Sequence, residues 1–169
     1  MLKVLVPVDG SPNSQHAVRH VIKEFAKNRA MEVHLLNVQA PFSRHIAQFA
    51  SRKNCDSFHH DEAEKALRPV RGMLEAVGVP YTAHIEVGRK AVVIAETARR
   101  LRCDNIVLST ARKNSLTRMI EASVTNRVLE LTTVPVQVIA GDAVSNLERY
   151  GISAAIGATL ASLLLAAVD

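Results

Sequence analysis

The sequence predicts an α/β protein with a doubly wound, mostly parallel sheet of five strands. Short runs rich in Val, Leu and Ile alternate with longer segments whose apolar residues recur at helical spacing. This alternation continues up to about residue 140, as is typical of a parallel sheet with helical crossovers. The 169 residues, 48% of them hydrophobic, are enough for one well-packed domain and few for two.

The first predicted elements are a strand, a helix and a second strand. Residues 2–8 form an apolar strand, and Ser11 followed by Pro12 favours a helix start, because serine caps a helix and proline needs no donor there. Residues 31–38 are the second strand, and residues 40–57 form a polar connection with at most a short local helix. The apolar stripe of the first helix is Ala17, Val18, Val21, Ile22 and Phe25, and the local helix would contain Phe42, Ile46 and Phe49.

The remaining elements follow the same alternation. A second helix is predicted over residues 60–77, where Pro69 indicates a kink or a break. The later elements are a strand at 80–87, a helix at 91–101, a strand at 104–108, a helix at 116–131 and a strand at 134–140. We therefore expect one domain over residues 1–140.

The C-terminal segment differs from the rest of the chain. A polar linker is predicted over residues 141–151, and an apolar helix over 152–169 carries no charge before Asp169. Gly157 and Ala161 form a small-xxx-small pair that suits close helix packing. Three environments are open: packing on a dimer or a protein partner, membrane association of residues 152–168, or disorder.

Composition narrows the class of protein. The net charge is +5, but Lys and Arg are scattered without a block of five or six, so we expect no nucleic-acid partner. Cys55 and Cys103 lie far apart without a C-x-x-C motif, which favours a reducing, cytoplasmic location over a disulfide framework. The charged N-terminal residues do not resemble a secretory signal.

No catalytic or metal-binding motif is evident. Residues 59–62, His-His-Asp-Glu, lack the H-E-x-x-H register and are interpreted as a polar helix start rather than a metal site. Ser11 lacks a G-x-S-x-G context and is interpreted as a helix cap. We expect a protein that is not an enzyme and holds no metal.

Several short motifs follow one another over about residues 2–140. They are Val-Pro-Val-Asp-Gly-Ser at 6–11, Leu-Leu-Asn-Val at 35–38, Val-Gly at 87–88, Asp-Asn-Ile-Val-Leu at 104–108, Ser-Val-Thr-Asn-Arg-Val at 123–128 and Val-Pro-Val-Gln-Val at 134–138. In this order and spacing the motifs resemble the universal stress protein family. The resemblance implies a five-stranded parallel sheet of order 3-2-1-4-5, adenine nucleotide alpha hydrolase-like, and usually a homodimer.

This strand order places a candidate site at the carboxyl ends of strands one and four, a topological switch point where open α/β sheets bind ligands. The resemblance implies that Asp9 contacts the nucleoside and Val38 the base, and that a loop of pattern G-x2-G-x9-G-[ST] after strand four wraps the phosphates. Asp9 could equally be a turn residue that bonds its own backbone. If nucleotide binding is retained, the residues involved are Pro7, Asp9, Val38, Leu108, Ser109, Arg112, Ser123, Val124 and Thr125.

The phosphate loop departs from the family pattern. Its three glycine positions are Ser109, Arg112 and Ala122, and a side chain restricts close backbone approach and positive φ. In one interpretation the site no longer binds ATP and no cofactor is present. In the other, Arg112 and Lys113 supply charge for a weak or altered anion site, and ATP remains possible.

Strand five would be a sheet edge rich in valine, which needs a cover. A homodimer that pairs this edge, through Val134, Val136 and Val138, is the expected solution. Three functions result: a stress-response or regulatory protein that acts by binding as a homodimer without tight ATP binding, an ATP-binding regulatory switch, and a membrane-tethered adaptor that uses the apolar tail.

Overall fold

The computed structural model describes residues 1–42, 51–112 and 124–143. Five parallel strands form one sheet of order β3-β2-β1-β4-β5, which confirms the predicted fold class. The predicted C-terminal helix over 152–169 and most of the predicted linker lie outside the described residues. The strands are β1 (Leu2–Pro7), β2 (Met31–Gln39), β3 (Tyr81–Val87), β4 (Asn105–Arg112) and β5 (Val136–Ala143).

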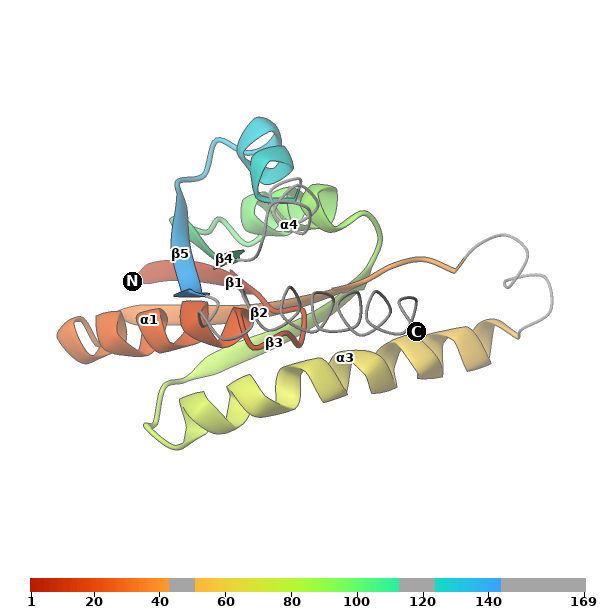
Figure 1. The fold of residues 1–169 in the computed structure, drawn as a ribbon, viewed down its shortest axis with the longest axis horizontal. Helices are drawn as coiled ribbons and strands as arrows, with labels where there is room; N and C mark the ends of the chain where they lie inside the picture. Colours follow the sequence, from red (N-terminus) through yellow and green to blue (C-terminus); the bar gives the residue numbers. More distant parts are fainter. Residues whose placement is uncertain (43–50, 113–123, 144–169) are drawn as a thin grey trace, which may run out of the picture.

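Helices cover both faces of the sheet. Helices α1 (Ser14–Lys27) and α3 (Arg52–Glu75) lie on one side, whereas α4 (Lys90–Arg100) and the helical residues 124–131 lie on the other (Figure 1). Helix α1, which follows β1, and the helical residues 124–131, the next described residues after β4, lie on opposite faces of the sheet. The boundary between β1 and β4 is therefore a topological switch point.

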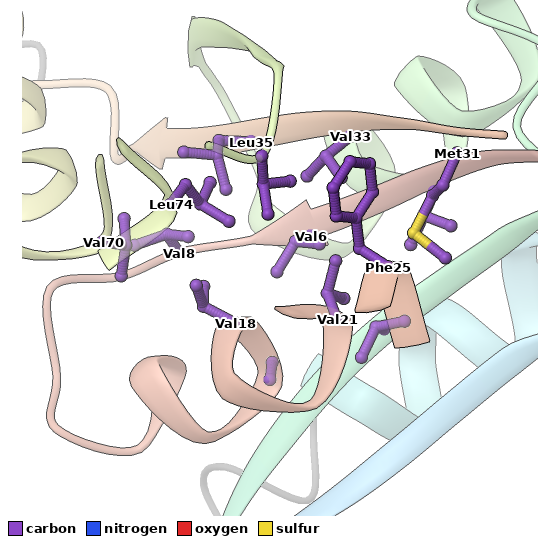
Figure 2. Close-up of a cluster of buried hydrophobic side chains, with 14 of the residues drawn as sticks. Val6, Val8, Val18, Val21, Phe25, Met31, Val33, Leu35, Val70 and Leu74 are labelled. Atoms are coloured by element: carbon purple, nitrogen blue, oxygen red, sulfur yellow. The ribbon is translucent and has the colours of Figure 1, made fainter. Parts of the chain in front are cut away.

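An aliphatic core fills the space between the sheet and α1 and α3. Phe25, Val21 and Val18 of α1 point toward Val6 and Val33 of the sheet (Figure 2). A second buried cluster, which includes Leu5, Leu36, Ile94, Ile106 and Val128, lies between the other face and α4. Alternate residues of the central strands are therefore buried on opposite faces, which is typical of a parallel sheet covered on both sides.

Two helices start away from their predicted positions. Helix α1 begins at Ser14, because residues 11–13 form a turn in which the Ser14 N–H lies 3.2 Å from the Ser11 carbonyl oxygen. Helix α3 begins at Arg52, well inside the predicted polar connection, and the Ser51 side chain caps it by accepting from the Asn54 N–H. A kink or a break was predicted at Pro69, and α3 continues through this residue without a break.

Strands β4 and β5 are both longer than predicted, and this changes the interpretation of the phosphate loop. Ser109 and Arg112 were expected in a loop, but both belong to β4, where they pair with Ile139 and Ala143 of β5. A register shift separates Thr110 from Arg112. Residues 141–143, predicted as linker, belong to β5. The carboxyl ends of β4 and β5 consist of polar and small residues. They stay in strand conformation because the backbones of the two strands pair with each other, and this pairing needs no apolar side chains.

Candidate ligand-binding site

A cavity of about 260 Å³ lies at the carboxyl ends of β1, β2 and β4, at the switch point of the sheet. Its floor is apolar, with Leu36, Val38, Ile94 and Leu108 among its residues, and its rim is polar. The described residues that line it are Pro7, Val8, Asp9, Ser11, Asn13, Ser14, Leu36, Val38, Lys90, Ile94, Leu108, Ser109, Val124 and Thr125. An apolar base with a few convergent polar groups is the usual composition of a small-molecule site.

The turn after β1 is held by Asp9. Its Oδ1 accepts from the Ser11 N–H at 3.0 Å and from the Ser11 hydroxyl at 2.6 Å, so the interpretation of Asp9 as a turn residue is confirmed. Gly10 between them has a φ of +80°, and a Cβ there would lie 3.1 Å from the Ala66 Cβ of α3. This turn places the Asp9 carboxylate at the cavity while occupying only one of its oxygens.

A buried amide joins the ends of β1 and β2 beneath the site. Asn37 is 2% exposed, and its Nδ2 donates to the Val8 carbonyl oxygen at 2.8 Å. The Gln39 side chain in turn donates to the Asn37 Oδ1 at 2.7 Å. The amide thereby fixes the chain that leads into Asp9. The position of Asn37 between Leu36 and Val38, near the end of a mostly buried strand, was the sequence signal for this role, and it was missed.

Ser109 contributes an unpaired hydroxyl to the cavity lining. Its Oγ is buried and has no hydrogen-bond partner among the described residues. Buried hydroxyls are normally hydrogen-bonded, so this atom is suited to a ligand or to water in the cavity.

Lys90 connects this cavity with a second, more polar one. It is the first residue of α4 and lines both cavities. The described residues around the second cavity are Asp9, Gly10, Asn37, Val38, Gln39, Ala40, Glu62, Ala66 and Lys90. Asp9, Val38 and Lys90 belong to both linings, so the cavities adjoin. Lys90 and Glu62 were not predicted, because only the packing of α4 and α3 onto the strand ends brings them there.

The structure brings most of the predicted site residues together. Pro7, Asp9, Val38, Leu108, Ser109, Val124 and Thr125 all line the first cavity, although their role in binding stays a prediction. Arg112 lies in β4, and Ser123 is outside the described residues. Sequence reasoning missed Val8, Ser11, Asn13, Ser14, Leu36, Lys90 and Ile94 as lining residues.

The acidic and histidine residues of α3 do not form a metal centre. Within the ranges that the structure describes, no group of three or more His, Cys, Asp or Glu side chains is placed to hold a metal ion. His59 is buried, whereas His60 and Asp61 face solvent.

Comparison with known proteins identifies the family. A sequence model of the universal stress protein family matches residues 1–140. The chain belongs to the universal stress protein family. It is therefore a stress-response protein by family, and the predicted resemblance is confirmed.

Individual members of the family support this assignment. Universal stress protein MJ0531 of Methanocaldococcus jannaschii is 32% identical over 139 residues, which cover 81% of each chain. The solved structure of protein MJ0577 has a TM-score of 0.67 and 26% identity, and the match covers 83% of this chain and 96% of that one. A family protein from Arabidopsis thaliana, solved with AMP bound, has a TM-score of 0.61 and 20% identity, over 85% and 94% of the two chains.

Among the described residues, no helix combines the length and the apolar composition needed to cross a bilayer.

Proposed function

We propose that this universal stress protein is a cytoplasmic regulator that acts by binding as a homodimer, without turnover and without tight ATP binding. The observation that carries the proposal is the β4–β5 ladder over Ser109–Arg112. In the family pattern this segment begins the loop that wraps the phosphates. Here it is a strand without glycine.

Pairing with β5 gives the backbone of Ser109–Arg112 an extended geometry that differs from that of a phosphate-binding loop. Such loops hold phosphates with several backbone N–H groups that point into one concavity. In a parallel ladder, the N–H and C=O groups of alternate residues are directed sideways at the neighbouring strand, so part of the backbone donors of this segment is used in pairing with β5. The lost glycines also leave side chains where the backbone would have to approach the ligand.

The cavity still supports binding of a small ligand. Its volume of about 260 Å³ is near the lower limit of ordinary ligand pockets, and this suits a nucleoside-sized molecule. The Arabidopsis thaliana protein with AMP bound shares the fold, which is compatible with such a ligand. The alternative, an ATP-binding switch, is favoured by the unpaired Ser109 hydroxyl and by Thr125, both on the rim.

The exposed apolar residues near β5 support the homodimer. Val138 in β5 is 43% exposed, and Leu129 and Leu131 of the helix before it are 51% and 42% exposed. Val136 is half-buried against the α4-side core, and so is Val134, which precedes the strand. An edge strand with such neighbours is normally covered by a partner.

Titration with ATP tests the proposal. We expect native mass spectrometry to show a dimer without nucleotide, and calorimetry to show no ATP binding tighter than about millimolar, about −4 kcal/mol. Micromolar ATP binding that Asp9→Ala abolishes would instead establish the ATP switch. Asp56→Ala, an exposed change on α3, is the matched control.

The adaptor hypothesis depends on residues 152–168, which lie outside the described residues. The apolar composition of this segment supports it. If the tail binds membranes, the full chain floats with lipid vesicles and Leu160→Lys abolishes flotation, because a lysine costs about 2.5–3.5 kcal/mol at the centre of an inserted helix. Equal recovery of both proteins in the soluble fraction would exclude the tether.

A further inference from the structure

We propose that the outward face of α1 docks on anionic lipid headgroups, so that the protein associates with membrane surfaces through this helix. The inference goes beyond the proposed function, because it requires neither the homodimer nor any property of the cavity. It concerns a face of the molecule that the candidate site does not use.

The basic residues of α1 form a single stripe. At about 100° of rotation per residue, Arg19, Lys23 and Lys27 lie within an arc of about 80°. This arc lies opposite the apolar residues that α1 buries in the core, and all three side chains are exposed. Two histidines, His16 and His20, complete the same face. The stripe is therefore the solvent-facing surface of the helix.

A single carboxylate offsets this charge. Residues 14–29 carry four Lys and Arg side chains and one carboxylate, a net charge of +3, whereas the whole chain has a net charge of +5. The carboxylate is Glu24, whose Oε1 lies 2.8 Å from the Lys27 Nζ. Neither Arg19 nor Lys23 forms an ion pair with another residue that the structure describes. Two exposed cations of the stripe are thus available to an anionic partner.

The stability of the helix does not explain the stripe. Arg19, Lys23 and Lys27 follow one another at intervals of four residues, and like charges at this spacing destabilise a helix. Helix α3, which covers the same face of the sheet, carries five cations and five carboxylates and pairs some of them, as Lys65 and Glu62 do at 2.6 Å. A solvated helix needs only such a balanced pattern. Binding to an anionic partner accounts for the unbalanced pattern of α1.

The end of the last strand brings the apolar C-terminal segment close to this stripe. Helix α1 packs against β4 and β5, and β5 ends beside the start of α1 (Figure 1). A Cβ added to Gly141 of β5 would lie 2.5 Å from the Oδ1 of Asn13, the residue before the helix. Residues 144–151 span at most about 28 Å, and the 14 residues of α1 extend over about 21 Å. The uncharged segment 152–168 therefore begins within reach of the whole stripe.

An anionic membrane surface matches both the stripe and the neighbouring apolar segment. Each Lys or Arg close to such a surface raises the affinity about fivefold, and an apolar segment that enters the lipid adds to this. Stable attachment to a membrane usually takes two signals of this kind. Nucleic-acid binders instead make about six to ten phosphate contacts, more than three cations provide, and have no use for an apolar segment.

Co-sedimentation of the full chain with lipid vesicles tests the inference. The vesicles contain phosphatidylcholine with about one quarter phosphatidylglycerol, or phosphatidylcholine alone, at about 0.15 M salt. We expect the wild type to bind the anionic vesicles at least about tenfold more tightly than the neutral ones. Arg19→Glu removes a cation and adds an anion, so it should weaken binding to the anionic vesicles by about 20-fold, and Lys23→Glu should do the same.

Arg99→Glu is the matched control. Arg99 is exposed at the end of α4, on the other face of the sheet from α1 (Figure 1). The variant makes the same change in net charge, but its distance from the stripe exceeds the screening length, so binding should stay within about twofold of the wild type. Melting curves by circular dichroism show whether each variant keeps the fold.

Four results would overturn the inference. The wild type could show no preference for anionic vesicles, or Arg19→Glu and Lys23→Glu could bind like the wild type. An equal loss in Arg99→Glu would assign the binding to net charge rather than to α1. Binding that only Leu160→Lys abolishes would assign it to the C-terminal segment alone. Tighter, Arg19-dependent binding to duplex DNA would make the stripe a nucleic-acid surface. Tight ATP binding or a monomer would contradict the proposed function and leave these vesicle results unchanged.

Discussion

At the scale of single residues, the candidate site depends on Gly10 in the turn after β1. Its φ of +80° lies in the left-handed region, where a Cβ costs about 1 kcal/mol or more. The added Cβ would also lie 3.1 Å and 3.3 Å from the Cβ and Cα of Ala66. This turn orients Asp9 and Ser11, so its geometry determines the shape of the cavity rim.

Gly10→Ala should therefore destabilise the protein by about 1–3 kcal/mol and weaken any ligand of the cavity. Urea denaturation measures the first effect. Gly72→Ala is the matched control, because Gly72 is exposed within α3 and its added Cβ meets nothing within 4 Å. That change should stabilise the protein by about 0.5–1 kcal/mol. Equal effects of the two changes would contradict the role of the turn.

A second residue-scale feature is the contact between His34 of β2 and His84 of β3. The His34 Nδ1 and the His84 Nε2 are 3.1 Å apart, and the His34 Nε2 lies 3.1 Å from the Glu32 carboxylate. Burial lowers the pKa of His34, despite the opposing effect of Glu32. Burial also lowers the pKa of His84, and the charges of His34 and Arg100 add to this. Both imidazoles are thus stabilised in the neutral form.

Acid should consequently destabilise the fold through this pair. Because the pKa values of both histidines are lowered by folding, the folded state binds fewer protons than the unfolded chain when the pH falls below 6.5. The free energy of unfolding is therefore at its full value above pH 6.5 and decreases as the pH falls below it. We expect His34→Gln to flatten the decline of the melting temperature between pH 7.5 and 5. His60→Gln, an exposed change on α3, should leave the slope as in the wild type. An unchanged slope in His34→Gln would refute this account.

At the scale of elements, the sequence predicted strongly periodic segments well and polar segments poorly. Helix α1 was recognised because its apolar residues recur at helical spacing, and β2 because it is a short, largely apolar run. The first turns of α3 were missed because residues 52–57 are mostly polar, and only the Ser51 cap signals their start. The end of β4 was missed because Ser109 and Thr110 are held by pairing with β5, a non-local contact that no local pattern reveals.

The same limit applies to the candidate site. Residues at strand ends, such as Asp9 and Val38, were predictable once the resemblance implied the strand order. Lys90 and Glu62 were not predictable, because they reach the cavities from helices whose packing depends on tertiary contacts. Ser11 was predicted as a helix cap, and its hydroxyl does accept from the Ser14 N–H at 3.4 Å, although it also donates to Asp9 at 2.6 Å.

Hydrogen exchange tests the β4–β5 ladder directly. We expect peptides that contain Ser109 and Thr110 to exchange much more slowly than those of the turn around Gly78, because ladder hydrogen bonds protect amides. Addition of ATP should not change this rate. Fast exchange that slows when ATP is added would mean that the segment is a phosphate-binding loop in solution.

At the scale of the whole molecule, the sheet has two different edges. The β3 edge contains polar and charged residues such as Thr82, His84 and Glu86, with one exposed valine, Val87, at its end. The β5 edge instead has exposed Val138 close to a helix with exposed Leu129 and Leu131. Because an uncovered apolar edge favours association, we expect the proposed homodimer to form through the β5 side, where exposed Val138 and two exposed leucines lie close together.

Val138→Lys should therefore convert a dimer into a monomer, as measured by sedimentation velocity. The side chain is 43% exposed, so the fold of the protomer should tolerate a lysine there, whereas a dimer interface would have to bury its charge. Val77→Lys is the matched control, because Val77 is 50% exposed in the turn between α3 and β3. A dimer that survives Val138→Lys but dissociates in Val77→Lys would place the interface at the opposite edge. A wild-type monomer would show that β5 has no partner copy.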